Sequence, residues 1–129
     1  RMYLAVYGTL RRGGPANGLL RGGKWLGLDR VPGILYDVGP FPALRPNKKG
    51  YESNTVLVDV YEIDEGILPA IDKYEGHYPE ALDQSLFVRR EVLTKEGTLP
   101  VTVYEYRFDP VACIVESGDW FDVRRPLDD

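Results

Sequence analysis

Short runs of apolar and β-branched residues recur along the chain, separated by glycine, proline and polar turns. Residues 3–7 are mostly apolar without polar alternation, which is typical of a strand buried on both faces. In the clearest run, residues 55–63, valines occupy one face and Leu57, Tyr61 and Ile63 the other. The pattern predicts six strands, at residues 3–7, 24–31, 34–38, 55–63, 85–93 and 101–108, and a short extended piece around 113–115 in an otherwise irregular tail.

One segment has the periodicity of a helix. Its apolar residues recur at spacings of three and four, at Ile67, Leu68, Ile71 and Tyr74. Asp64 is the expected N-cap and Gly76 the expected C-terminal glycine. Because Pro69 would remove a hydrogen bond from a helix interior, we expect the regular helix to begin near it, after a looser first turn.

These elements predict an α+β fold, a small mixed β-barrel of about six strands with one or two short flanking helices. A closed barrel leaves fewer unpaired strand edges than an open sheet. A chain of 129 residues has the size of one domain with one core. Arg1 precedes Met2 and resembles a residue left from expression, so the predicted domain covers residues 2–129.

The charge balance argues against nucleic acid as a partner, and the lack of a long apolar run argues against a membrane span. The formal net charge is −4, whereas nucleic-acid binding needs basic residues clustered on one face. No stretch has the roughly 18 apolar residues of a membrane span, and the single cysteine fits a reducing compartment, so we predict a cytoplasmic protein. The basic pairs are expected to be solvated: Arg11-Arg12, Lys48-Lys49, Arg89-Arg90 and Arg124-Arg125.

The sequence gives little support to a zinc site or to a Ser-His-Asp catalytic triad. With His77 the sole histidine and Cys113 the sole cysteine, a His/Cys zinc site of the usual kind cannot be assembled. A Ser-His-Asp triad would have to use His77, and no nucleophile elbow is present. We therefore predict no metal and no cofactor.

The turn after the first strand is the first candidate site. Gly8, Thr9 and Leu10 follow the apolar strand directly and lead into Arg11-Arg12. A glycine can take positive φ and lets another group approach the main chain closely. Successive N–H groups turned inward would form a concavity that suits a carboxylate or a phosphate. The alternative is an ordinary strand-to-loop turn.

Glu75 is the second candidate. It falls at the C-terminal end of the predicted helix, beside Tyr74 and Tyr78, where unpaired carbonyls present partial negative charge. This environment disfavours the carboxylate and is expected to raise its pKa, which suits a group that gives and takes protons. The alternative is an ordinary surface residue at a helix end.

Taken together, the motifs resemble the gamma-glutamylcyclotransferase-like family, nearest to its small gamma-glutamylamine cyclotransferase group. The likeness spans nearly the whole chain in order. It rests on Val6-Tyr-Gly-Thr-Leu-Arg-Arg-Gly13, Pro32-Gly33-Ile-Leu-Tyr36, Val60-Tyr61-Glu-Ile-Asp64, Ile71-Asp72-Lys-Tyr-Glu75-Gly76, Val103-Tyr104-Glu-Tyr106 and Glu116-Ser-Gly-Asp-Trp120.

The resemblance implies a small barrel whose cavity opens at the loop of Tyr7, Gly8, Thr9 and Leu10, which would hold a glutamyl head. It also implies that Glu75 is the catalytic acid and base. The implied reaction is attack by the α-amine of a gamma-glutamyl compound on its own γ-carbonyl, which forms 5-oxo-L-proline and expels an amine without a cofactor.

Other interpretations remain open. Tyr104 and Tyr106 share a strand face, so Tyr104 is a candidate for lining the cavity, although aromatic residues on such strands also form cores. Trp120 is a candidate packing anchor. Besides an enzyme, the motifs would fit a non-catalytic metabolite-binding module that uses the Tyr7–Leu10 loop, or a partner-binding domain with an exposed strand edge. The leaving amine and the oligomeric state do not follow from the sequence.

Overall fold

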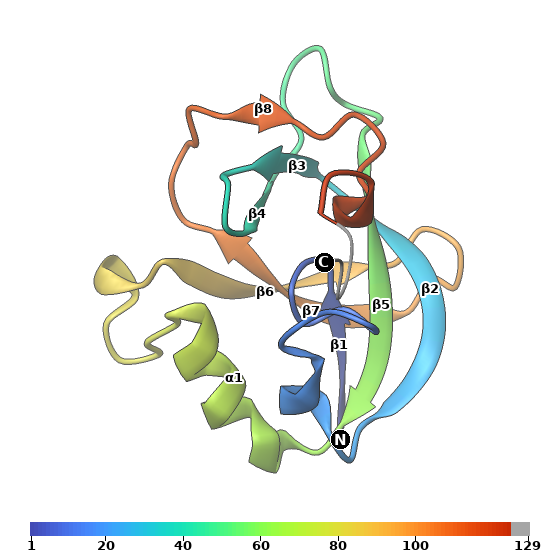
Figure 1. Ribbon diagram of the computed structural model, residues 1–129, viewed down its shortest axis with the longest axis vertical. Coiled ribbons are helices and arrows are strands. Elements are labelled where there is room, and N and C mark those ends of the chain that lie inside the picture. The colour runs from blue at the N-terminus through green and yellow to red at the C-terminus, as the bar shows by residue number, and fades with distance from the viewer. Residues whose placement is uncertain (125–129) are drawn as a thin grey trace.

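Five strands form the larger of two sheets in the computed structural model, which describes residues 1–124 (Figure 1). Along the sheet the order is β2-β5-β1-β7-β6, so β1 is central, antiparallel to β5 and parallel to β7. In Figure 1, β2 and β5 run vertically whereas β6 runs horizontally, so the sheet is strongly twisted. The strands are β1 (Met2–Val6), β2 (Lys24–Pro32), β5 (Thr55–Ile63), β6 (Phe87–Leu93) and β7 (Pro100–Tyr106).

A second sheet of three antiparallel strands lies beyond one end of β5, at the top of Figure 1. It consists of β3 (Ile34–Asp37), β4 (Pro42–Arg45) and β8 (Cys113–Ile114), with β3 in the centre. The α+β class is therefore confirmed. The predicted barrel of about six strands is not, because the described strands pair in two sheets with free edges.

All six predicted strands are present, with ends shifted by no more than two residues. β8 lies at the expected extended piece, and residues 125–129 of the predicted tail fall outside the described residues. β4 was not predicted, since Pro42 follows a Gly-Pro-Phe turn and proline is rare in strands. Here Pro42 is the first residue of a strand at the edge of its sheet, where a missing N–H is tolerated.

The predicted helix is α1 (Leu68–Glu75), an eight-residue helix with Pro69 in its first turn. Asp64 caps the short 3-10 turn before it, accepting a 2.7 Å hydrogen bond from the N–H of Gly66. Gly76 ends α1 in the left-handed conformation at φ 68°, as expected of a C-terminal glycine. No helix of the described chain is long and apolar enough to cross a membrane.

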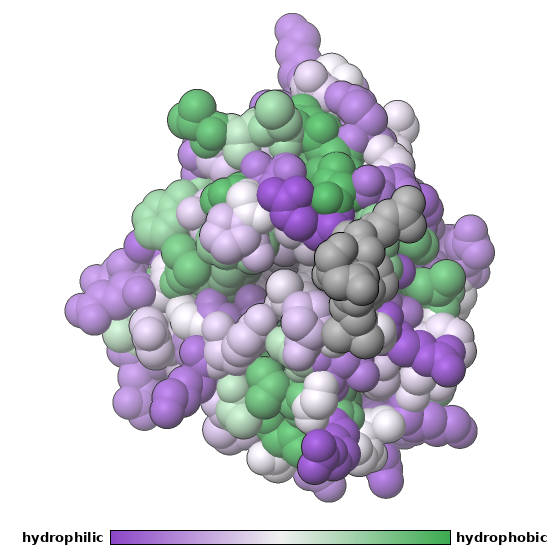
Figure 2. All heavy atoms as spheres, viewed as in Figure 1, coloured by the Kyte–Doolittle hydropathy of each residue, from purple (hydrophilic) through white to green (hydrophobic). Residues whose placement is uncertain are grey.

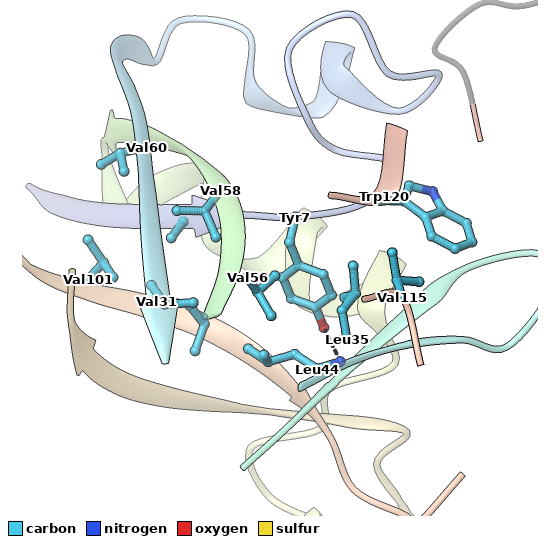
Figure 3. Close-up of a cluster of buried hydrophobic side chains, with 12 residues drawn as sticks. Tyr7, Val31, Leu35, Leu44, Val56, Val58, Val60, Val101, Val115 and Trp120 are labelled. Carbon is cyan, nitrogen blue, oxygen red and sulfur yellow. Dashed lines mark hydrogen bonds between the residues drawn. The ribbon is translucent and has the colours of Figure 1, made fainter. Parts of the chain in front are cut away.

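The two faces of β5 enter two different hydrophobic clusters. Val56, Val58 and Val60 pack with residues of the second sheet and with Trp120, which is only 2% exposed and serves as the expected anchor (Figure 3). Tyr61 and Ile63 face the other cluster, which includes residues of α1. On the face seen in Figure 2, the remaining hydrophobic residues gather in separate groups among hydrophilic ones. Residues at the end of β1 belong to both clusters, and a pocket opens there between α1 and β4.

Candidate functional site

A pocket of about 320 Å³ opens where the loop after β1 meets the end of α1. The turn before β4 and the start of β6 close its other sides. All six site residues predicted from the sequence line it, although they come from three separate parts of the chain. The lining comprises Ala5, Val6, Tyr7, Gly8, Thr9, Leu10, Pro40, Phe41, Pro42, Tyr74, Glu75, Leu86, Phe87 and Tyr104.

Gly8 is required in the loop by close packing. Of the two properties of glycine considered above, Gly8 does not use positive φ. A Cβ built on Gly8 would instead lie 2.6 Å from Cγ and 2.9 Å from Cδ of Pro42. The absence of a side chain at Gly8 therefore lets β4 approach the loop and close one wall of the pocket.

The hydrogen bonds of this loop run through its carbonyl groups. The Gly8 carbonyl accepts from the N–H of Arg11 at 3.0 Å, and the Thr9 carbonyl from that of Ala16 at 2.9 Å. The Leu10 carbonyl accepts from the side-chain amide of Asn17, also at 2.9 Å. Between residues 1 and 124, the N–H groups of Gly8, Thr9 and Leu10 donate to no surrounding loop or side-chain acceptor. The loop thus has backbone donors free beside the pocket, an arrangement that can bind an anion.

Arg11 is buried, contrary to the expectation of a solvated basic pair. Its Nε donates to Asp59 at 2.9 Å and its Nη1 to Asp119 at 2.7 Å, and its guanidinium lies 4.0 Å from the centre of the Phe121 ring. Two carboxylates and a ring face thus replace the water that would otherwise solvate this cation. Arg12 does remain exposed. Arg11 therefore fixes the loop to β5 and to the Asp119 segment.

Glu75 lies half-buried in the pocket wall, and burial raises its pKa from the ordinary 4.5 to about 7. The direction agrees with the prediction, but the cause differs. The carbonyls of Asp72 and Lys73 at the end of α1 are already bonded, by the N–H groups of His77 and Gly76. No hydrogen bond or ion pair holds the Glu75 carboxyl within residues 1–124, so this group is free to exchange protons with a ligand.

Of the two tyrosines expected beside Glu75, Tyr74 lines the pocket and Tyr78 does not. The Tyr74 hydroxyl lies 2.7 Å from Oγ1 of Thr9 and so bridges α1 and the loop. Tyr78 is exposed and is not among the lining residues. The bridge holds Glu75 beside the loop of free N–H groups.

Tyr104 donates a 2.5 Å hydrogen bond from its hydroxyl to Oδ1 of Asp72. Nε of Arg89 lies 3.4 Å from the same oxygen. Burial and the Asp72 carboxylate raise the pKa of Tyr104, so its proton is held toward Asp72. The hydroxyl oxygen keeps acceptor capacity for a ligand in the pocket. Sequence reasoning missed Asp72 and Arg89; the only signal was that Asp72 lies one helical turn before Glu75.

Tyr7 links the two sheets. Its hydroxyl donates to the carbonyl of Tyr104 at 2.5 Å and accepts from the N–H of Leu44 at 3.4 Å, the bond drawn in Figure 3. The Tyr7 ring packs in the hydrophobic cluster that contains Trp120. Burial raises the pKa of Tyr7 well above the ordinary value for tyrosine. Tyr7 therefore shapes the pocket by joining β1, β4 and β7.

The described residues contain no group of three or more histidine, cysteine, aspartate or glutamate side chains placed to hold a metal ion. His77 is buried, with Nδ1 3.2 Å from the carbonyl of Phe87, and Cys113 is exposed. The chemistry that this arrangement supports is anion binding beside a carboxyl group that titrates near neutral pH.

Known proteins resemble the chain over nearly its whole length. A relative from Pyrococcus horikoshii, named "Putative gamma-glutamylcyclotransferase PH0828", is 30% identical over 123 residues, which are 94% of this chain and 92% of the relative. The crystal structure of PH0828 has a TM-score of 0.76 at 29% identity and covers 96% of this chain and 93% of its own.

Two further solved structures share the fold. The solution structure of YtfP from Escherichia coli has a TM-score of 0.66 at 26% identity, covering 95% of this chain and 98% of its own. The crystal structure of an AIG2-like protein from Mus musculus has a TM-score of 0.69 at 22% identity, covering 92% and 88%. The family model described as "Gamma-glutamyl cyclotransferase, AIG2-like" matches residues 4–122. The chain belongs to this gamma-glutamyl cyclotransferase, AIG2-like family.

Proposed function

We propose that the chain converts a gamma-glutamyl amine, or a metabolite protected by a gamma-glutamyl group, to 5-oxo-L-proline and the free amine, with Glu75 as general acid and base. One observation carries the proposal: a carboxyl group that has no partner among residues 1–124, with its pKa raised to about 7, lies in the same pocket as a loop whose N–H groups are free of those residues too. The raised pKa places the proton exchange of Glu75 near neutral pH.

The loop would hold the α-carboxylate of the substrate. The N–H groups of Gly8, Thr9 and Leu10 are the donors available to it. Arg11 keeps these donors in place through a buried ion pair with Asp59 and a partly buried one with Asp119. Because the nucleophile and the carbonyl belong to one molecule, fixing the carboxylate limits the search for the reactive geometry and lowers the entropic barrier.

Bond changes and proton transfers then balance without water or a cofactor. The α-nitrogen bonds to the γ-carbon, and the bond from that carbon to the amine nitrogen breaks. The Glu75 carboxylate accepts a proton from the attacking nitrogen and returns it to the leaving nitrogen. Tyr104, whose own proton is committed to Asp72, offers its oxygen as an acceptor for an N–H of the substrate amine.

The test compares wild type, Glu75→Gln and the matched control Glu80→Gln, which changes an exposed acid outside the pocket. Each is incubated with gamma-glutamyl amines, and 5-oxoproline is measured by mass spectrometry. We expect product from wild type and control, with kcat/KM falling below about pH 7, and a loss of at least ~100-fold in Glu75→Gln.

Full activity in Glu75→Gln would refute the role of Glu75. Stoichiometric substrate binding without product in all three proteins would instead support a non-catalytic metabolite-binding module that uses the Tyr7–Leu10 loop. The two outcomes are distinguished by calorimetry on the same substrates.

A further inference from the structure

Five residues of the pocket wall beside the proposed glutamyl site are apolar, and together we call them the apolar end. The polar end of the pocket consists of the loop, the Thr9–Tyr74 bridge, Glu75 and Tyr104. Among the described lining residues, Glu75 carries the only charged side chain. The apolar end comprises Pro40, Phe41 and Pro42, around the start of β4, and Leu86 and Phe87, at the start of β6. Ala5 and Val6 of β1 add further apolar wall.

Aromatic packing braces this apolar end. The ring of Phe41 meets the ring of Phe87 edge-on, with 5.7 Å between their centres. Tyr106 lies behind both, 6.0 Å from Phe41 and 5.2 Å from Phe87. Phe87 is buried, whereas its neighbour Leu86 is 38% exposed. The wall thus leads from a buried aromatic floor to an apolar edge at the solvent.

Two arginines beside the apolar end are engaged elsewhere. Arg45 donates to the carbonyl of Tyr106 at 3.0 Å and to Asp109 at 2.8 Å. Arg107 donates to the carbonyls of Ser85 and Asp83, at 2.7 and 2.8 Å. A carboxylate bound at the apolar end would therefore have to take one of these two guanidinium groups from its partners. A bound ammonium would lose water without gaining an acceptor from the side chains of the five described residues that form this end.

With the α-carboxylate at the loop and the γ-carbonyl near Glu75, the substituent of the leaving nitrogen is left with this apolar end. The whole pocket, at about 320 Å³, lies at the small end of the range for ligand sites, which favours a short substituent on the leaving nitrogen. We propose that the substrates are gamma-glutamyl amides of short, uncharged primary amines with alkyl or aromatic groups, an inference that rests on the function proposed above.

The test uses three probes of equal length that differ only at the far end of the amine. They are gamma-glutamyl n-butylamide, its counterpart ending in an ammonium group, and its counterpart ending in a carboxylate. Production of 5-oxoproline gives kcat/KM for each. We expect kcat/KM for the butylamide to exceed that for each charged probe at least ~10-fold, since an unpaired charge loses its hydration on entering an apolar pocket.

Leu86→Asp adds an acceptor at the apolar edge, and Leu82→Asp adds the same charge at an exposed leucine outside the lining. We expect Leu86→Asp to shift the ratio of ammonium probe to butylamide by about tenfold toward the ammonium probe, and Leu82→Asp to leave it unchanged.

The possible results distinguish a failure of the proposed amine specificity from a failure of the proposed cyclotransferase function. Product from all three probes at similar kcat/KM would overturn the apolar specificity and leave the cyclotransferase intact. So would a faster reaction of a charged probe. No product from any probe, together with none from the wider panel of gamma-glutamyl amines, would refute the proposed function itself.

Discussion

Replacing Glu75 by glutamine is expected to change how protein stability depends on pH. Burial raises the pKa of this carboxyl to about 7, whereas in the unfolded chain it titrates near 4.5. Between these values the folded state holds a proton that the unfolded state has lost, so wild type loses stability as the pH rises. At about 1.4 kcal/mol for each pH unit of that interval, the loss reaches up to about 3 kcal/mol.

The assay is urea unfolding of wild type and Glu75→Gln at about pH 4 and about pH 8. Glutamine cannot ionise, so the variant lacks this contribution and is expected to gain up to about 3 kcal/mol over wild type between the two pH values. Comparing the changes with pH cancels any constant effect of the amide. Glu80→Gln, at an exposed acid, should follow wild type. Parallel pH profiles for wild type and Glu75→Gln would refute the buried, unpaired carboxyl.

Two further substitutions test the walls of the pocket. Gly8→Ala should destabilise the protein by about 1–3 kcal/mol, because its Cβ would lie 2.6 Å from Cγ of Pro42. Gly18→Ala, with no atom within 4 Å of its Cβ, should change stability by less than ~1 kcal/mol, and equal urea midpoints for the two variants would contradict the close packing. Arg11→Met should cost about 3–5 kcal/mol, since Asp59 stays buried without its cation. Adding Asp59→Leu should recover part of that loss, and no recovery would contradict the pairing.

The strands and the helix were predicted from patterns within a few neighbouring residues. The alternation in β5, the cap at Asp64 and the glycine at Gly76 are each encoded within a few neighbouring residues, and each is found where expected. β4 escaped prediction because its pairing with β3 decides its conformation against the local preference of Pro42. Closure of a barrel depends on strand register and twist across the whole sheet, which local patterns do not specify.

The candidate site shows the same division. The six site residues were proposed from local chemistry together with motif likeness, and the fold brings all of them to one pocket. The cause of the raised pKa at Glu75 and the burial of Arg11 did not follow, because both depend on residues that are distant in the sequence. Asp59 and Asp119 lie 48 and 108 residues from Arg11 along the chain, so nothing near Arg11 distinguishes it from a surface cation.

The pairing of Arg11 with Asp119 also bears on the order in which the protein takes shape during synthesis. β1 and its loop leave the ribosome about a hundred residues before Asp119, yet that aspartate supplies one of the two carboxylates that neutralise Arg11. Trp120, in the core, emerges at the same late stage. A nascent chain therefore exposes an incompletely held loop until translation has passed these residues, so the native set of contacts around Arg11 can form only late in synthesis.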